Sequence, residues 1–173
     1  MKHIIINGTL FNISWFAVIY SQSLPIALLV VLIHLSLHAW LQSPQRGEWI
    51  LIALVSALGI ALDQLIFAAG MLVYPASPGL APLWLSCLWP LLASCLCHAF
   101  AGLQQRLLLA ALVGSVGGAF SYIAGTRLSS IEFGDPVAGP VLIGLCWALL
   151  MPALLLMAAH LQTQGETHHD PST

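Results

Sequence analysis

Asp63 is the residue whose type and position most clearly indicate chemistry in this chain. It stands near the middle of a long apolar run, and the side-chain amide of Gln64 follows it directly. A carboxylate near the centre of a bilayer costs about 2.5–3.5 kcal/mol to insert, so it faces the protein interior and marks a functional site by default. We therefore predict that Asp63 and Gln64 belong to a substrate or ion pathway. A structural hydrogen bond between helices is the alternative for Asp63.

Two histidines offer a second kind of chemistry. His34 and His38 lie four residues apart in an earlier apolar run, so a helix places both on one face. Counting along that run puts His34 at the depth of Asp63, where the pair could transfer protons or orient a substrate headgroup. The histidines could also hold a metal ion, but no third ligand is evident. No metal site and no cofactor are therefore predicted, and hydrogen bonding between helices is the alternative.

The cysteines are predicted to be small packing residues. Cys87, Cys95, Cys97 and Cys146 all lie inside apolar runs, where disulfides are not expected. Cys95 and Cys97 stand close to His98, which suggests a cluster of soft metal ligands. Residues at positions i, i+2 and i+3 of one helix point in different directions, however, so one helix cannot close such a site. His98 remains a candidate for the polar pathway.

Polar residues in the first apolar run indicate that this segment lies inside the bundle. Asn12 is the main candidate there, and we expect its amide to bond across to another helix. A place in the lining of a polar cavity is the further interpretation. The same run contains Asn7, Thr9 and Ser14.

Arg127 is the candidate for contact with a headgroup. It directly follows the fifth apolar run and stands near Glu132 and Asp135. A guanidinium at the membrane surface can bind a lipid phosphate through two parallel hydrogen bonds. A salt bridge to one of the two neighbouring carboxylates is an equal alternative.

Glycines in the fifth apolar run have the spacing of helix contacts. Gly114 and Gly118 form a G-x-x-x-G motif, which lets two helices in a membrane approach closely. We predict that these two glycines, together with Gly125, are packing positions.

The composition requires a bilayer around these residues. The chain has 173 residues, of which 60% are hydrophobic and 6% are charged. A soluble domain carries roughly 25% charged residues, so this chain has too few to cover a globule. Only four residues are Lys or Arg, and the net charge is −2. No basic patch exists for nucleic acid, and the lipid bilayer is the expected partner of most of the surface.

Six apolar runs have about the 20 residues that a spanning helix needs. An open sheet cannot satisfy its backbone in lipid, so we predict an all-α polytopic membrane protein, a bundle of six transmembrane helices. The expected helices form a single domain over residues 1–161, and a disordered polar tail follows at 162–173. The helices are predicted at residues 4–20, 24–41, 48–74, 81–100, 107–125 and 137–161.

Basic residues predict the orientation. With six spans, Lys2, Arg46 and Arg106 fall on one side of the membrane and only Arg127 falls on the other. Loops that carry more Lys and Arg stay in the cytoplasm. We therefore expect both termini to be cytoplasmic, in the inner membrane of a bacterium.

A faint internal repeat relates the third and fourth runs to the fifth and sixth. At an offset of 58 residues, the segment 53–61 resembles 111–119, and Trp89 falls on Trp147. Parallel repeats of this kind occur in some transporters. Coincidence is the alternative, because leucine, alanine and glycine dominate the chain.

Several spaced motifs resemble a known family. They combine Trp, Asp, His and Gly residues, which makes them more specific than an apolar pattern. The motifs are Asn7 with Phe11-Asn12 and Trp15-Phe16, Asp63 with Gly70, Pro82-Leu83-Trp84-Leu85 with Leu88-Trp89 and His98, and Gly114 with Gly117-Gly118, Ser121-Tyr122, Ala124-Gly125 and Leu128. Through them the chain resembles the proteobacterial inner-membrane family catalogued as domain of unknown function 2878. The resemblance implies a helical bundle without an assigned activity, and a lipid-related role by association with genes for fatty-acid-modifying enzymes.

Three functions are compatible with these residues. The first is handling of a membrane lipid or another apolar substrate, which means binding it, moving it or supporting its modification. The second is an accessory or scaffold subunit for a membrane enzyme, with a membrane-protein partner or a second copy of the chain. The third is a small proton-coupled or cation-coupled transporter. The sequence does not decide whether the chain is an enzyme and favours a non-enzymatic role, because no set of catalytic residues is complete.

Overall fold

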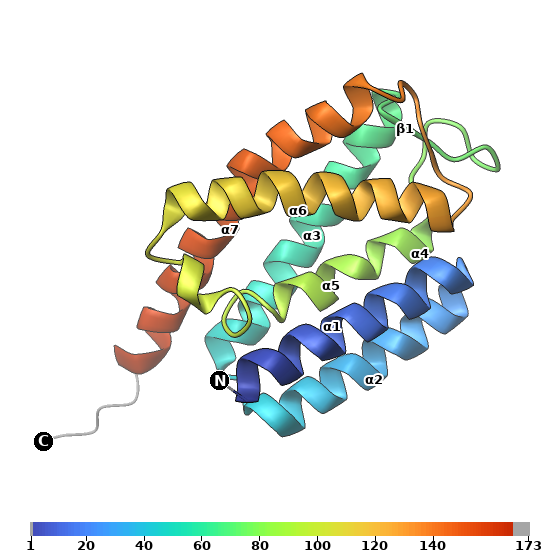
Figure 1. The fold of residues 1–173 in the computed structure, drawn as a ribbon. Helices are drawn as coiled ribbons and strands as arrows, with labels where there is room; N and C mark the ends of the chain where they lie inside the picture. The colour runs from blue at the N-terminus through green and yellow to red at the C-terminus, as the bar shows by residue number, and fades with distance from the viewer. Residues whose placement is uncertain (1, 168–173) are drawn as a thin grey trace, which may run out of the picture.

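The computed structural model describes residues 2–167 of the chain. Five helices in this part are long and apolar enough to cross a membrane. They pack side by side in Figure 1. The predicted class, an all-α multi-pass membrane protein, is confirmed by these helices. The five are α1 (Lys2–Ser21), α2 (Leu24–Gln42), α3 (Arg46–Ala68), α6 (Leu107–Leu128) and α7 (Ala138–Thr167).

The outer faces of these helices require lipid. Leu32, Leu108 and Leu149 expose 65%, 78% and 78% of their surfaces, and many other large apolar side chains are exposed with them. Contiguous apolar surface of this kind is unstable in water, because soluble proteins keep such patches small. The exposed leucines are therefore expected to face the acyl chains of the bilayer.

The fourth apolar run does not form one long helix, so the prediction of a helix over residues 81–100 is wrong. It forms two short helices, α4 (Leu83–Ser86) and α5 (Leu88–Ala93), followed by turns and by the 3-10 helix η1 (Ala101–Leu103). Pro90 has no N–H to donate to the turn before it, which weakens the helix there. Beyond Ala93 the backbone changes to hydrogen bonds that span three residues in place of four, such as the one from the Leu96 N–H to the Ala93 carbonyl.

This broken segment is enclosed by the long helices. Cys87, Leu91, Ala93 and Leu96 are all buried. In Figure 1, α4 and α5 lie between α1 and α6, in the middle of the bundle. Irregular backbone at membrane depth is tolerated only where protein surrounds it. The segment therefore fills the centre of the bundle, and the count of six full spans stays a prediction.

The third predicted helix ends earlier than expected. The prediction was residues 48–74, whereas α3 ends at Ala68, and Gly70 then turns the chain with a φ of +70°. The next residues form strand β1 (Leu72–Val73), which pairs in antiparallel fashion with β2 (Glu132–Phe133). This two-stranded ribbon ties the loop after α3 to the loop after α6.

Two further boundaries differ from the prediction. The fifth helix was predicted to end at residue 125, and α6 continues to Leu128. The polar tail was predicted to be disordered from residue 162, whereas α7 continues to Thr167. The rest of that tail, residues 168–173, lies outside the described residues.

The basic residues Arg46 and Arg106 lie at one end of the bundle and Arg127 lies at the other, as the sequence predicts. Figure 1 shows α1, α3 and α6 beginning on the same side of the bundle as the end of α7. Arg46 begins α3, and Arg106 directly precedes α6, so both lie at this end. Arg127 lies in the last turn of α6, at the opposite end. The cytoplasmic location of the first end stays a prediction.

Candidate functional site

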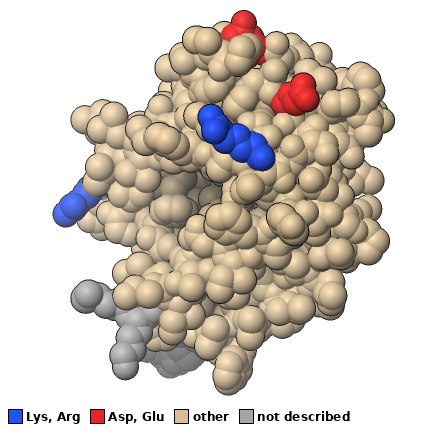
Figure 2. All heavy atoms as spheres, turned by 45° about the vertical axis from the view of Figure 1, so that its right-hand side comes forward, with Lys and Arg blue, Asp and Glu red and all other residues tan. Residues whose placement is uncertain are grey.

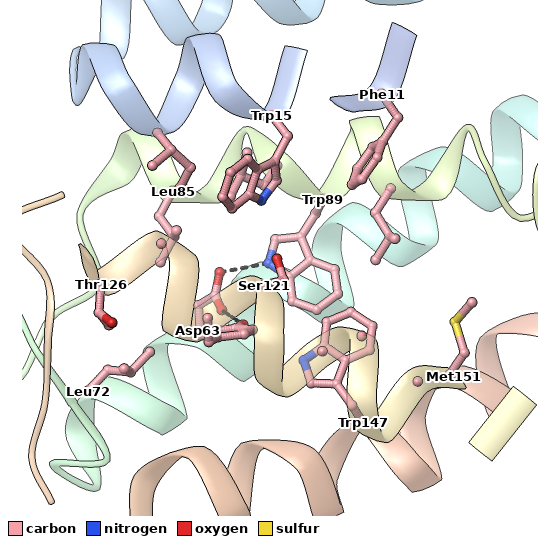
Figure 3. Close-up of a pocket in the computed structure, with 18 of the residues that line it drawn as sticks. Phe11, Trp15, Asp63, Leu72, Leu85, Trp89, Ser121, Thr126, Trp147 and Met151 are labelled. Carbon is pink, nitrogen blue, oxygen red and sulfur yellow. Dashed lines mark hydrogen bonds between the residues drawn. The ribbon is translucent and has the colours of Figure 1, made fainter. Parts of the chain in front are cut away.

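The carboxylate of Asp63 lies on the inner wall of a cavity between α1 and α6. The cavity has a volume of about 230 Å³. Aromatic side chains form much of its lining, and Figure 3 shows Trp89 at the centre, with Trp15 on one side and Trp147 on the other. Asp63 is only 1% exposed, so this carboxylate is almost fully enclosed.

Glycines on two faces of α6 explain why the cavity exists. On the face toward α7, Gly114 and Gly118 allow close contact, because a Cβ at Gly118 would lie 2.3 Å from Cγ of Trp147. On the face toward α1, Gly117 has no other atom within 4 Å of the position of a Cβ. Gly125 lines the same open side. The helix thus packs tightly on α7 and leaves space beside α1.

Two aromatic donors hold the carboxylate of Asp63. The indole N–H of Trp89 donates to Oδ2 at 2.7 Å, and the hydroxyl of Tyr122 donates to Oδ1 at 3.3 Å. Trp89 is fixed from two sides. Its ring stacks on Trp147 with centroids 5.8 Å apart, and it lies against Gly59, where a Cβ would fall 1.8 Å from the indole. The side chain of Asp63 is therefore preorganised by neutral groups.

Asp63 lies nearer one end of α3 than the sequence indicated. Because the helix ends at Ala68, Asp63 stands five residues from that end, or about 7.5 Å along the axis. The same end of the cavity is lined by Thr126 and Ser129, which flank Arg127. The polar part of the cavity thus lies toward the end of the bundle that carries Arg127.

The cavity is partly open to the outside. Figure 2 shows a hollow in one face of the molecule, bordered mainly by uncharged atoms and with cationic atoms close to it. Arg127 itself is exposed. In the described part of the chain, neither ion pair involves Arg127, and the predicted alternative of a salt bridge to Glu132 or Asp135 is not formed.

His34 does not pair with Asp63, so the predicted histidine–aspartate pair is wrong. Its Nδ1 bonds to the hydroxyl of Ser14 and its Nε2 to the hydroxyl of Ser94, both at 2.9 Å. The reason is the rotation of the helices. The His34 face of α2 is turned toward α1 and the turn after α5, whereas Asp63 faces α6. His34 is fully buried in this hydrogen-bond network.

Two other candidates also lie away from Asp63. Asn12 is exposed and donates to the carbonyl of Gly8 in its own helix, so the prediction that it bonds across the bundle is wrong. The polar residue of α1 that does reach across is Asn7, which donates to the carbonyl of Ser94. Gln64 exchanges hydrogen bonds with the backbone of Ala81 and fixes the loop before α4.

His98 belongs to a different cluster, at the opposite end of α3. Oε1 of Glu48 lies 2.9 Å from Nε2 of His38 and 2.8 Å from Nε2 of His98. His38 is fully buried, and the side chain of His98 is 19% exposed. Cys95 and Cys97 are free thiols and are not among these contacts. The cluster is therefore formed by groups far apart in the sequence.

Sequence reasoning missed three residues of these two sites. Glu48 begins the third predicted helix and is not among the predicted site residues. Trp89 and Tyr122 are part of the spaced motifs, but nothing in the sequence links them to Asp63. One signal existed, since the repeat offset that aligns Trp89 with Trp147 joins two rings that stack in the structure.

Comparisons with known proteins agree with the motifs. The chain matches a family model described as "Protein of unknown function (DUF2878)" over residues 4–153. No curated protein and no solved structure matches it. The matched part includes Asp63, Trp89 and Tyr122, and also Glu48 with its two histidines. The chain therefore belongs to the DUF2878 family of proteins of unknown function, as its spaced motifs predict.

Proposed function

We propose that the protein binds a membrane lipid, or a similar amphiphile, in the cavity between α1 and α6. The observation that carries the proposal is one buried carboxylate in a lining that is otherwise mostly apolar and aromatic. Ligand sites commonly have this composition, with a few polar groups that fix the orientation of the ligand. The polar end of the lipid would meet Asp63, and its acyl part would lie along the glycine face of α6.

The size of the cavity suits part of a lipid. Its volume of about 230 Å³ is below the range of roughly 300–1,000 Å³ that encloses a drug-sized ligand. A section of one acyl or isoprenoid chain would occupy it, and the rest of the molecule would stay in the bilayer. Entry would then be lateral, between α1 and α6.

Arg127 supplies a second element of the proposal. It stands between Thr126 and Ser129, which line the cavity, and its own side chain is exposed. A guanidinium binds phosphate and carboxylate groups well. An anionic headgroup at the membrane surface would therefore contact Arg127 while the chain enters beside Asp63. In the expected orientation this end faces away from the cytoplasm of a bacterial cell.

The test is photolabelling in lipid nanodiscs. The full-length protein is reconstituted with phosphatidylethanolamine and phosphatidylglycerol that carry a diazirine in one acyl chain, and labelled residues are mapped by mass spectrometry. We expect label on residues of the cavity wall, including Asp63, in addition to exposed residues such as Leu108 and Leu149.

Two phenylalanine variants on one helix provide the matched comparison. Gly117→Phe places a ring in the open space of the cavity, so we expect cavity labelling to fall at least about tenfold while surface labelling persists. Val116→Phe changes the neighbouring residue, which is 57% exposed and does not line the cavity, and it should label like the wild type. Label confined to exposed residues in all three proteins would contradict the proposal.

Asp63→Asn separates lipid binding from the remaining candidates. If the carboxylate meets the polar end of a lipid, this variant should keep the fold and lose part of the cavity labelling. An accessory subunit would tolerate the change without any effect on labelling. A proton-coupled or cation-coupled transporter would lose ion flux in proteoliposomes while lipid labelling stayed the same.

A further inference from the structure

The cluster of His38, Glu48 and His98 has the composition of a metal site. Both Nε2 atoms lie within 2.9 Å of the same oxygen, Oε1 of Glu48. All three ligand atoms lie within 4.8 Å of one another. Two imidazoles and one carboxylate are the protein ligands of many catalytic zinc sites and of non-haem iron sites. We infer that this cluster binds one divalent first-row transition-metal ion.

The two distances between a histidine nitrogen and the Glu48 oxygen require only a small rearrangement to admit an ion. Bonds of about 2.0–2.2 Å in a tetrahedral site separate neighbouring ligand atoms by about 3.3–3.6 Å. The two N···O distances of 2.9 and 2.8 Å are shorter, because a hydrogen atom lies between each pair. The imidazoles must move away from the carboxylate by roughly half an ångström, which rotation of the side chains can provide.

Three separate elements supply the ligands. His38 lies near the end of α2 and Glu48 in the first turn of α3, and the short connection at residues 43–45 holds these two helices together. His98 comes from the turns after α5, where its ring contacts that of His38 with centroids 5.3 Å apart. Of the two histidines of α2, only His38 takes part, and its partners are Glu48 of α3 and His98, which the break in the fourth apolar run brings to the cluster.

The position of the cluster gives an ion access from water. Glu48 is the third residue of α3, so the cluster lies at one end of the bundle and not at the centre of the membrane. The side chains of His38 and Glu48 are 0% and 7% exposed, whereas that of His98 is 19% exposed. Catalytic metal sites keep an open position for water or substrate, and structural sites are closed. The exposed side of His98 provides such an opening.

Charge also favours a cation at this position. An ionised carboxylate can only accept hydrogen bonds, so without a metal both imidazoles must donate Nε2–H to Glu48. A buried carboxylate costs several kcal/mol unless it is paired, and a divalent ion pairs it directly. Nδ1 of His38 is buried and has no hydrogen-bond partner among the described residues. His38 thus makes its polar interaction through Nε2 alone, the nitrogen that faces the cluster.

The test measures zinc bound to the full-length protein in detergent. The protein carries a purification tag without histidine, is exposed to Zn²⁺, and is freed of excess metal before elemental analysis. We expect about one zinc ion per chain in the wild type. Glu48→Gln and His98→Ala each remove one ligand and should weaken Zn²⁺ binding more than about 100-fold in competition with a chelating dye.

Two control variants test whether histidines outside the cluster bind the zinc. His3→Ala changes an exposed histidine at the start of α1 that contacts Gln42, and it should bind zinc like the wild type. The double variant His168→Ala, His169→Ala removes the adjacent histidines of the C-terminal tail and should also bind normally. Loss of zinc in the tail variant with full binding in Glu48→Gln would overturn the inference, and so would a wild type without zinc.

A second measurement distinguishes the loss of a metal ligand from a failure of the variant to fold. Co²⁺ in place of Zn²⁺ gives visible absorption bands that report its ligand geometry, and these bands should change in Glu48→Gln and His98→Ala while size-exclusion profiles stay the same. Unchanged bands in both folded variants would contradict the assignment. Photolabelling of the cavity at Asp63 should be unaffected, so the failure of one proposal can be told from the failure of the other.

Discussion

Two carboxylates are buried in this bundle, one toward each end of α3. Asp63 accepts hydrogen bonds from an indole and a phenol, those of Trp89 and Tyr122. Glu48 accepts from two imidazoles, those of His38 and His98. They are fifteen positions apart on the helix, which corresponds to about 22 Å along its axis. Each region therefore stabilises its buried carboxylate with hydrogen-bond donors of its own, and the donors are of different kinds.

The difference between the donors predicts a difference in ligand. Indole and phenol groups cannot take a positive charge or bind a metal ion as neutral donors, so they leave Asp63 suited to a hydrogen bond with a substrate. Imidazoles ligate metals and can be protonated, so they leave Glu48 suited to a cation. The surroundings of the two carboxylates agree with this, because a cavity adjoins Asp63, whereas the side chain of His98, which is 19% exposed, adjoins Glu48.

Removal of the Glu48 carboxylate should lower the free energy of unfolding more than any of the other substitutions below. Glu48→Leu leaves two imidazoles without their acceptor, and we expect a loss of about 3–5 kcal/mol of unfolding free energy. Thermal unfolding in detergent micelles, with metal removed, measures this loss. Glu48→Gln keeps an acceptor oxygen and should lose clearly less. Equal stability of the leucine variant and the wild type would show that the histidines do not depend on Glu48.

Removal of the indole donor of Asp63 should have a smaller effect. Trp89→Phe leaves Oδ2 of Asp63 without its 2.7 Å partner, and we expect a loss of about 1–3 kcal/mol beyond the loss of ring area. Trp84→Phe is the matched control. Trp84 is buried to the same degree, but its indole N–H has no hydrogen-bond partner in the described structure. If the two variants unfold at the same temperature, the indole of Trp89 contributes no specific stabilisation.

The hydroxyl of Tyr122, which donates to Asp63, should contribute less to the free energy of unfolding than the indole of Trp89. Tyr122→Phe removes the longer hydrogen bond, at 3.3 Å, and the average cost of such a bond within a membrane is about 0.6 kcal/mol. The same unfolding measurement applies, with Tyr20→Phe as the control because Tyr20 is 82% exposed. A larger loss in Tyr122→Phe than in Trp89→Phe would reverse the order of the two donors.

The exposed carboxylate of Asp135 is the reference for the two buried carboxylates. Its removal should change the free energy of unfolding least. It accepts from the backbone N–H groups of Ala138 and Val137 at the start of α7, and these bonds hold its pKa below the ordinary value. A lowered pKa in the folded state adds stability above the unfolded pKa of about 3.9 and loses it as the pH falls through the folded pKa.

A comparison of Asp135→Asn with the wild type measures this contribution. The difference in unfolding temperature should be constant between about pH 7 and pH 5 and should shrink toward pH 3, because the wild-type carboxyl then becomes neutral. A difference that grows on acidification would contradict the assigned hydrogen bonds.

Much of the fold could be predicted from single stretches of sequence. The helices that correspond to α1, α2 and α6 were placed within a few residues, because an apolar run of spanning length specifies a helix locally. The fourth run does not form the long helix that its sequence predicts, because its apolar residues satisfy the same rule and only Pro90 indicates a weak point. Burial among the other helices is what makes its irregular backbone stable, and burial is not a local property.

Less of the candidate sites could be predicted. Asp63 was identified because a carboxylate in an apolar run is rare, but its partners Trp89 and Tyr122 were not. Asn12 and His34 were assigned the wrong contacts, because the rotation of each helix about its axis decides which residues face inward. Rotation depends on the packing of the neighbouring helices, which the 3.6-residue period alone does not fix.

The sequence by itself determined that the chain is a helical membrane protein, since composition and the length of apolar runs depend on nearby residues only. It also determined that Asp63 would be enclosed, since the bilayer penalises an exposed carboxylate. The tertiary structure alone decided which polar groups meet. His98 reaches Glu48 across 50 residues of sequence because the fourth run breaks after Ala93. The open face of α6 beside α1 likewise exists only once Gly114 and Gly118 have packed against α7.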